Sequence, residues 1–163
     1  MELLHKSKLP PSEMKNIKLV YLNIFLVSAS VVCFEIISTR ISSVIFVNDY
    51  AFFILSLAIL GLGCGGIFCY YKIKNKEVTP SLKIISRSLL LFGASLCLFI
   101  ISVIKLSITD PFIYFFLLFI PFFFAGIAYA QVFKIYAEQS FKLYAADLCG
   151  AALCSIASLG LFS

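Results

Sequence analysis

Five long apolar runs, separated by short polar segments, constrain this chain more than any other feature of its sequence. We place them at about 18–41, 50–72, 85–106, 111–135 and 143–163. A helix that crosses a bilayer needs about 20 apolar residues, because the hydrocarbon core is about 30 Å thick and an α-helix rises about 1.5 Å per residue. We therefore expect an all-α, polytopic membrane helix bundle of about five transmembrane helices, preceded by a polar cytoplasmic tail at 1–17.

The composition leaves no room for a water-soluble domain of ordinary size. Of the 163 residues, 62% are hydrophobic and 13% are charged, whereas soluble proteins have roughly 45–50% apolar and about 25% charged residues. A nucleotide-binding sheet domain needs on the order of 100 residues, and no such stretch remains outside the spans. The sequence therefore excludes a separate soluble catalytic domain within this chain.

The basic residues are distributed as in a membrane protein of defined orientation. The net charge is +5, and 11 of the 13 Lys and Arg residues fall in the tail and in the two loops on the same side, against Arg40 and Lys105 on the other. Because basic loops stay on the cytoplasmic side, we predict a cytoplasmic N-terminus and a multi-pass membrane protein. Scattered loop charges of this kind do not predict a nucleic-acid partner. The fifth span ends at Ser163 without a basic or aromatic anchor, so it looks cut short, and a natural end and a truncation both stay open.

Neither a disulfide framework nor a metal site is expected. All six cysteines lie in apolar runs, where free Cys behaves as a small hydrophobic residue. The pairs Cys64/Cys69 and Cys149/Cys154 are five residues apart and so diverge around a helix, and the histidine, His5, lies in the tail. We also predict no bound cofactor.

The glycines of the second run predict close helix packing. The segment Gly61-Leu-Gly-Cys-Gly-Gly66 has the letters of a phosphate-binding loop, but such a loop follows a strand and opens a helix, whereas these glycines lie inside a span. Gly61 and Gly65 form a small-xxx-small pair that lets another helix approach closely. The fifth run has a comparable stripe that includes Ala146 and Gly150. We expect both helices to be buried in the bundle, or to meet a protein partner or a second copy of the chain.

Ionisable residues inside spans are rare, since each costs roughly 2.5–3.5 kcal/mol at a helix centre. Glu35 falls in the outer half of the first span, and we expect Arg40 or Lys105 as its partner. Asp147 falls toward the cytoplasmic side of the fifth span, where a basic loop residue or helix hydroxyls would satisfy it. Glu35 and Asp147 are not expected to meet. Functional and structural roles both stay open for these residues.

The fourth run contains two further polar or irregular positions. Pro121 must free a backbone carbonyl and bend the helix, which would either line a cavity or form a packing kink. Gln131 is the amide of this span and is expected to hydrogen-bond across the bundle.

Several motifs recur in the order and spacing of a known family: Phe34-Glu-Ile-Ile-Ser-Thr-Arg40, Tyr50-Ala-Phe52, Leu60-Gly-Leu-Gly63, Ile120-Pro-Phe122 and Leu143-Tyr-Ala-Ala-Asp-Leu-Cys-Gly-Ala-Ala152. From about residue 26 onward the chain resembles the N-terminal membrane domain of the spermidine synthase-like (polyamine aminopropyltransferase-like) integral membrane proteins of bacteria. The resemblance implies that Glu35, Arg40, Tyr144, Asp147 and Gly150 are motif positions. In that family a soluble domain typically follows, which would bind decarboxylated S-adenosylmethionine and a polyamine; that domain is missing here, and no catalytic residue is carried over.

Three functions are compatible with these features. The first is a non-catalytic membrane module of the spermidine synthase-like type, acting as an anchor or partner subunit through the second and fifth helices. The second is a small transporter-like or ligand-binding bundle that holds a cationic substrate such as a polyamine at Glu35, beside the Pro121 bend. The third is the membrane part of an aminopropyltransferase-like enzyme, which is the weakest because neither an activated nucleophile nor a phosphate loop is present.

Overall fold

The structure is a computed structural model. It describes the backbone of residues 11–45, 51–74, 82–106 and 110–162 and, within these ranges, the side chains of 19–45, 52–72, 83–105 and 110–160. The described part consists of helices alone: α1 (Pro11–Ile45), α2 (Ala51–Lys74), α3 (Leu82–Leu106), α4 (Pro111–Ile135), the short 3-10 helix η2 (Ala137–Gln139) and α5 (Ser140–Phe162). Each α-helix contains a segment of 21 to 27 residues that is apolar enough to cross a bilayer. The chain is therefore an all-α, multi-pass membrane protein, as the apolar runs predicted.

The predicted and the observed helix boundaries agree best where a helix is apolar up to both of its ends. The helix predicted at 111–135 has these bounds, because Pro111 occupies the first turn, where its missing N–H is not needed. The largest difference is at α1, which begins at Pro11, so residues 11–17 of the predicted tail are helical. Hydropathy detects only the apolar part of this helix, which starts at Leu19. Residues 1–10 of the tail and Ser163 lie outside the described residues.

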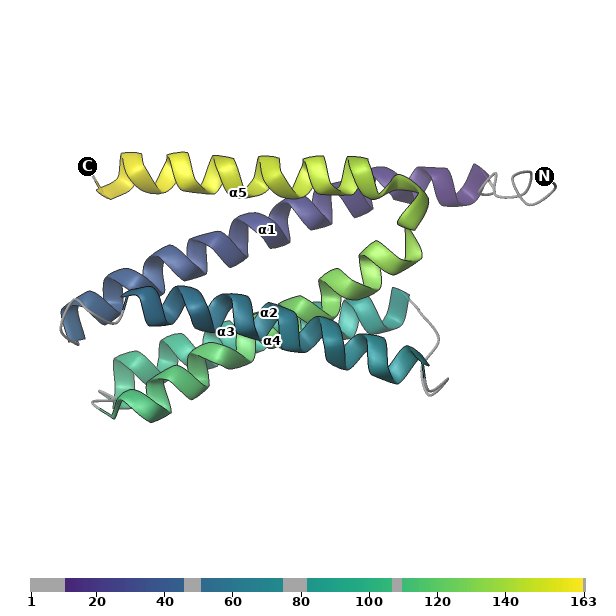
Figure 1. The fold of residues 1–163 in the computed structure, drawn as a ribbon. Coiled ribbons are helices and arrows are strands. Elements are labelled where there is room, and N and C mark those ends of the chain that lie inside the picture. The colour runs from purple at the N-terminus through teal and green to yellow at the C-terminus, as the bar shows by residue number, and fades with distance from the viewer. Residues whose placement is uncertain (1–10, 46–50, 75–81, 107–109, 163) are drawn as a thin grey trace.

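Helix α4 forms the centre of the bundle. It packs between α2 and α3, whereas α5 packs along α1, and α1 contacts α2 and α4 more weakly. Figure 1 shows α1 and α5 running in the same direction, with α2 and α4 in the opposite one. The parallel pairing of α1 and α5 is also seen in two hydrogen-bonded pairs at nearly constant sequence separation, Tyr21 with Gln139 and Ser28 with Asp147.

The core of the bundle is aromatic. The Phe34 ring lies 5.2 Å from that of Phe99 and 5.3 Å from that of Phe122, measured between centroids. Tyr114 extends the group, with its ring 5.4 Å from that of Phe99. Edge-to-face and tilted contacts of this kind stabilise a core beyond the area that they bury. These ring contacts join α1, α3 and α4 near the middle of the bundle.

The outer surface of the bundle is as apolar as its core. Leu90, Phe116 and Ile156 are 74%, 67% and 66% exposed. In water such residues would form an unusually large hydrophobic surface, whereas in a bilayer they contact acyl chains of similar polarity. The surface is therefore consistent with lipid contact on most sides.

The two ends of the bundle differ in charge. We call the end that holds the starts of α3 and α5 the basic end; among the described side chains, its exposed cations are Lys72, Lys83, Arg87, Lys134 and Lys142. At the far end the cations with described side chains are Arg40 and Lys105. A cytoplasmic location of the basic end stays a prediction from this asymmetry.

Candidate functional site

Asp147 on α5 is an ionisable residue inside a span that is hydrogen-bonded to two other helices. Its Oδ1 accepts a hydrogen bond of 2.9 Å from the Tyr129 hydroxyl on α4. Its backbone carbonyl accepts one of 2.7 Å from the Ser28 hydroxyl on α1. Of the two kinds of partner expected for Asp147, helix hydroxyls rather than a basic loop residue are therefore present.

This cluster, which we call the Asp147 cluster (Ser28, Tyr129 and Asp147), lies well inside the bundle. Asp147 is seven residues from Ser140 at the start of α5, which places it about 10 Å along the helix axis. A carboxylate at such depth is unfavourable unless it is hydrogen-bonded. The Tyr129 hydroxyl supplies that bond and ties three helices together.

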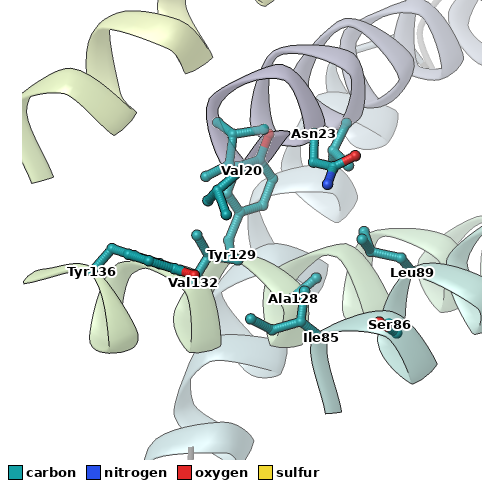
Figure 2. A pocket seen from close by; sticks show the side chains of 11 residues that line it. Val20, Asn23, Ile85, Ser86, Leu89, Ala128, Tyr129, Val132 and Tyr136 are labelled. Atoms are coloured by element: carbon teal, nitrogen blue, oxygen red, sulfur yellow. The ribbon is translucent and has the colours of Figure 1, made fainter. Parts of the chain in front are cut away.

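A cavity of about 240 Å³ adjoins this cluster. Its walls come from residues 20–27 of α1, 85–89 of α3 and 128–136 of α4. Figure 2 shows Tyr129 standing from α4 toward α1, and Asn23 on α1 opposite Ser86 and Leu89 on α3. Most of the lining is aliphatic or aromatic, with a few polar groups, which is the usual character of a small-molecule site.

Glu35 does not make the ion pair that we expected. It is half-buried in α1, and within the described residues it forms no hydrogen bond and no ion pair. The prediction of Arg40 or Lys105 as its partner is wrong, and both of those side chains are exposed. Arg40 is five residues further along, about 140° around the helix, so the two side chains diverge. Glu35 and Asp147 do not meet, as expected.

The cavity is also not where the Pro121 bend would have placed it. Pro121 is buried, and α4 continues through it. The cavity begins about two turns further along α4, at Ala128, and it ends at Val27 on α1, two turns before Glu35. Neither Glu35 nor Pro121 lines it.

Gln131 makes one interhelical contact. Its side chain is hydrogen-bonded to the Cys69 thiol on α2, as expected for an amide of this span. Its Oε1 has no hydrogen-bond partner within the described residues although the side chain is only 2% exposed. The contact lies on the α2 side of α4, away from the cavity.

The predicted packing glycines are used inside the chain. A Cβ at Gly61 would lie 2.6 Å from Phe122 Cβ, and one at Gly65 would overlap the Phe123 carbonyl oxygen, so both glycines let α2 approach α4. Gly126 on α4 is in the same close contact, against Leu62. These residues therefore join α2 to α4.

The stripe on α5 faces α1 instead. A Cβ at Gly150 would overlap the Phe25 carbonyl oxygen, and Ala146 packs near Ile24. Tyr144, a motif position of the resemblance, is 55% exposed and points away from this seam. The second and fifth helices therefore do not pack against each other.

The described residues contain no cluster of three or more His, Cys, Asp or Glu side chains that could hold a metal ion. The cysteines among them are free, and Cys33 on α1 contacts Cys154 on α5. The Asp147 cluster keeps a hydrogen-bonded carboxyl group inside the span, and the cavity can take a small apolar or amphiphilic ligand.

Sequence reasoning missed Tyr129, Ser28 and the cavity residues Asn23 and Ser86. Tyr129 carried a usable signal, because it lies seven residues inside a span, whereas most tyrosines of the chain fall near predicted helix ends. Ser28, Asn23 and Ser86 carried none, since small polar residues are spread over α1, α2, α3 and α5. Only the packing of the helices brings them together.

Comparison with known proteins gives no family assignment: no protein-family model, no curated protein and no solved structure matches this chain.

Proposed function

We propose that the chain is a non-catalytic membrane module of the spermidine synthase-like type, which serves in the bacterial inner membrane as an anchor or partner subunit. In this proposal the basic end is cytoplasmic, and the outer faces of α2 and α5 bind another membrane protein or a second copy. The sequence motifs support the family, and two unused small-residue faces support the assembly.

The observation that carries the proposal is a second glycine face on α2. Gly63 and Gly66 have no atom within 4 Å of the position that a Cβ would take. A glycine lowers helix stability by about 1 kcal/mol relative to alanine, and none of the described residues packs against these two. In membranes, small residues at such positions let a neighbouring helix approach closely.

Helix α5 has a comparable outer face. Ala145, Cys149 and Ala152 are exposed and lie at i, i+4 and i+7, on one side of the helix. The opposite side, with Gly150, is occupied by α1. From Ser155 to Gly160, Ser158 is partly buried and every other residue is exposed. Helix α5 is therefore the least covered helix of the bundle.

Crosslinking from natural cysteines tests the proposal. Cys149 lies on the α5 face, and Cys97 is an exposed cysteine on α3, outside both faces. In variants that keep only one of the two, a photoreactive maleimide attached in native membranes is expected to give a discrete protein adduct from Cys149 and only lipid adducts from Cys97. Equal protein adducts from both positions, or none from Cys149, would contradict the assembly.

The α2 face is tested by substitution. Gly63→Leu and Gly66→Leu have room within the chain, so the bundle should fold while the complex extracted in mild detergent becomes smaller. Gly93→Leu, at an open position on α3, is the matched control. An unchanged complex in the α2 variants would remove α2 from the interface.

Glu35 favours one second candidate, a bundle that binds or transports a cation such as a polyamine. A half-buried carboxylate without a partner in the described residues is suited to a cationic ligand. Glu35→Gln should then abolish uptake of labelled spermidine into vesicles while assembly is retained. Uptake equal to that of the unaltered protein would exclude this candidate.

A further inference from the structure

The cavity between α1, α3 and α4 has the size and polarity to hold a hydrocarbon chain. An apolar cavity of about 150 Å³ is enough to bind benzene, and this one measures about 240 Å³. Its inner wall is formed by Val27, Leu89 and Ala128, which offer no hydrogen-bonding side chain. An acyl segment of several carbons fits such a space better than water does.

Polar groups lie nearer the basic end of the same cavity. Asn23 is four residues past Leu19, and Ser86 is four residues past the start of α3, about 6 Å along each axis. Both side chains are exposed, and within the described residues neither makes a hydrogen bond. The cavity therefore changes from polar donors near the membrane surface to hydrocarbon below, as a phospholipid does.

The cavity lies at a gap between α1 and α3, which pack only weakly against each other among the described residues. Helix α1 packs mainly on α5, and α3 packs mainly on α4, whereas the described residues of α1 and α3 meet at few points, such as Phe34 against Phe99 deeper in the bundle. Asn23 and Ser86 flank this gap, as Figure 2 shows. A lipid can enter through it from the bilayer.

The charges around the gap favour an anionic headgroup. Lys83 is exposed and lies one turn before Ser86, on the same side of α3, and Arg87 follows on the next turn. Among the side chains that the structure describes, the exposed carboxylate at this end is that of Glu138 on η2, which does not line the cavity. Basic pockets between membrane helices bind anionic lipid headgroups in this way.

We propose that this cavity is a binding site for one anionic phospholipid of the leaflet at the basic end. One acyl chain enters between α1 and α3, and the phosphodiester lies near Lys83, Ser86 and Asn23. The proposal does not depend on the proposed function, because it concerns a lipid site on the chain itself.

Binding of phosphatidylglycerol with a fluorescent acyl chain to the full-length protein in detergent micelles tests it. We expect saturable binding that unlabelled phosphatidylglycerol displaces and that phosphatidylcholine and inorganic phosphate do not. Equal displacement by phosphatidylcholine would overturn the anionic headgroup, and absence of saturable binding would overturn the site.

Two pairs of variants locate the site. Lys83→Gln should weaken binding about fivefold, the effect of one basic residue near a membrane surface, whereas Lys134→Gln, at the same end but outside the cavity, should not. Ser86→Leu places a larger side chain at the polar end of the cavity and should abolish binding. Ala94→Leu, on an exposed part of α3 outside the cavity, should not. Equal losses within either pair would show general attraction rather than this cavity.

Discussion

The Tyr129 hydroxyl donates a hydrogen bond of 2.9 Å to Asp147 Oδ1 and so links α4 to α5 inside the membrane-spanning part. Helix α5 otherwise packs on α1. The bond therefore ties the α1–α5 pair directly to the α2–α3–α4 group. It also gives a carboxylate in a span the donor that it needs.

Removing the donor should loosen this link. In Tyr129→Phe the partly buried Asp147 carboxyl group stays inside the span without this partner, and we expect a loss of about 1–2 kcal/mol in the free energy of unfolding. The measurement is unfolding by SDS in mixed micelles, followed by circular dichroism. Tyr144→Phe removes an exposed hydroxyl from α5 and should have no effect. Equal stability of the two variants would show that the bond does not contribute.

The two glycine faces of α2 should respond in opposite ways to a single methyl group. Gly65→Ala places a Cβ against the Phe123 carbonyl oxygen, which is backbone and cannot rotate away, so we expect destabilisation of about 1–3 kcal/mol. Gly63→Ala has open space and should leave stability unchanged or raise it slightly. The same SDS titration distinguishes them. If Gly65→Ala were as stable as Gly63→Ala, α2 and α4 would not be in close contact.

Sequence could predict the spans but not their packing, and the reason is physical. Leu118 is fully buried and Phe116, two residues earlier on the same helix, is 67% exposed, yet both are strongly apolar. Because lipid is as apolar as the core, the side of a helix that faces its neighbours carries no hydrophobic signal. Gly61 and Gly65 were recognisable as contact points, since glycine is unfavourable in a helix, but their partner on α4 was not.

The sequence could predict the chemical type of a polar partner but not which residue provides it. A hydroxyl was among the partners expected for Asp147, although Tyr129 could not be named, because its distance from Asp147 depends on the α4–α5 connection. For Glu35 the expected charge partners, Arg40 and Lys105, were wrong, because a bridge to a neighbouring helix depends on how the helices pack, which the sequence does not show. The cavity could not be predicted at all, because three separate helices form it.

Tyr114, which is fully buried, should contribute more to the free energy of unfolding through its ring than through its hydroxyl. Ser42 donates to the Tyr114 hydroxyl at 3.0 Å, which in turn donates to the Ser38 carbonyl oxygen at 3.3 Å. In Tyr114→Phe the Ser42 hydroxyl can turn to a carbonyl of its own helix, so a loss of about 0.5–1.5 kcal/mol is expected. Tyr114→Ala also removes the packing with Phe99 and should lose about 3–5 kcal/mol. Tyr70→Phe, at an exposed site on α2, is the control, and equal losses in the two Tyr114 variants would contradict this division.

The parallel seam of α1 and α5 should be open to chemical crosslinking at one place. Cys33 and Cys154 are in side-chain contact across it, and a disulfide forms only when two cysteines lie this close. Mild oxidation in membranes is therefore expected to join them. A protease site introduced between α2 and α3 reveals the bond, because the two fragments stay together until they are reduced.

The same experiment tests whether the absence of a side chain at Gly150 lets α5 pack against α1. Leucine at this position would overlap the Phe25 carbonyl oxygen and force α5 away from α1, so Gly150→Leu should slow the Cys33–Cys154 crosslink severalfold. Gly160→Leu, in open space on the same helix, should not. A variant whose only cysteines are Cys33 and Cys97 measures the background crosslinking between cysteines of different helices. An undiminished crosslink in Gly150→Leu would mean that α5 does not depend on this contact to pair with α1.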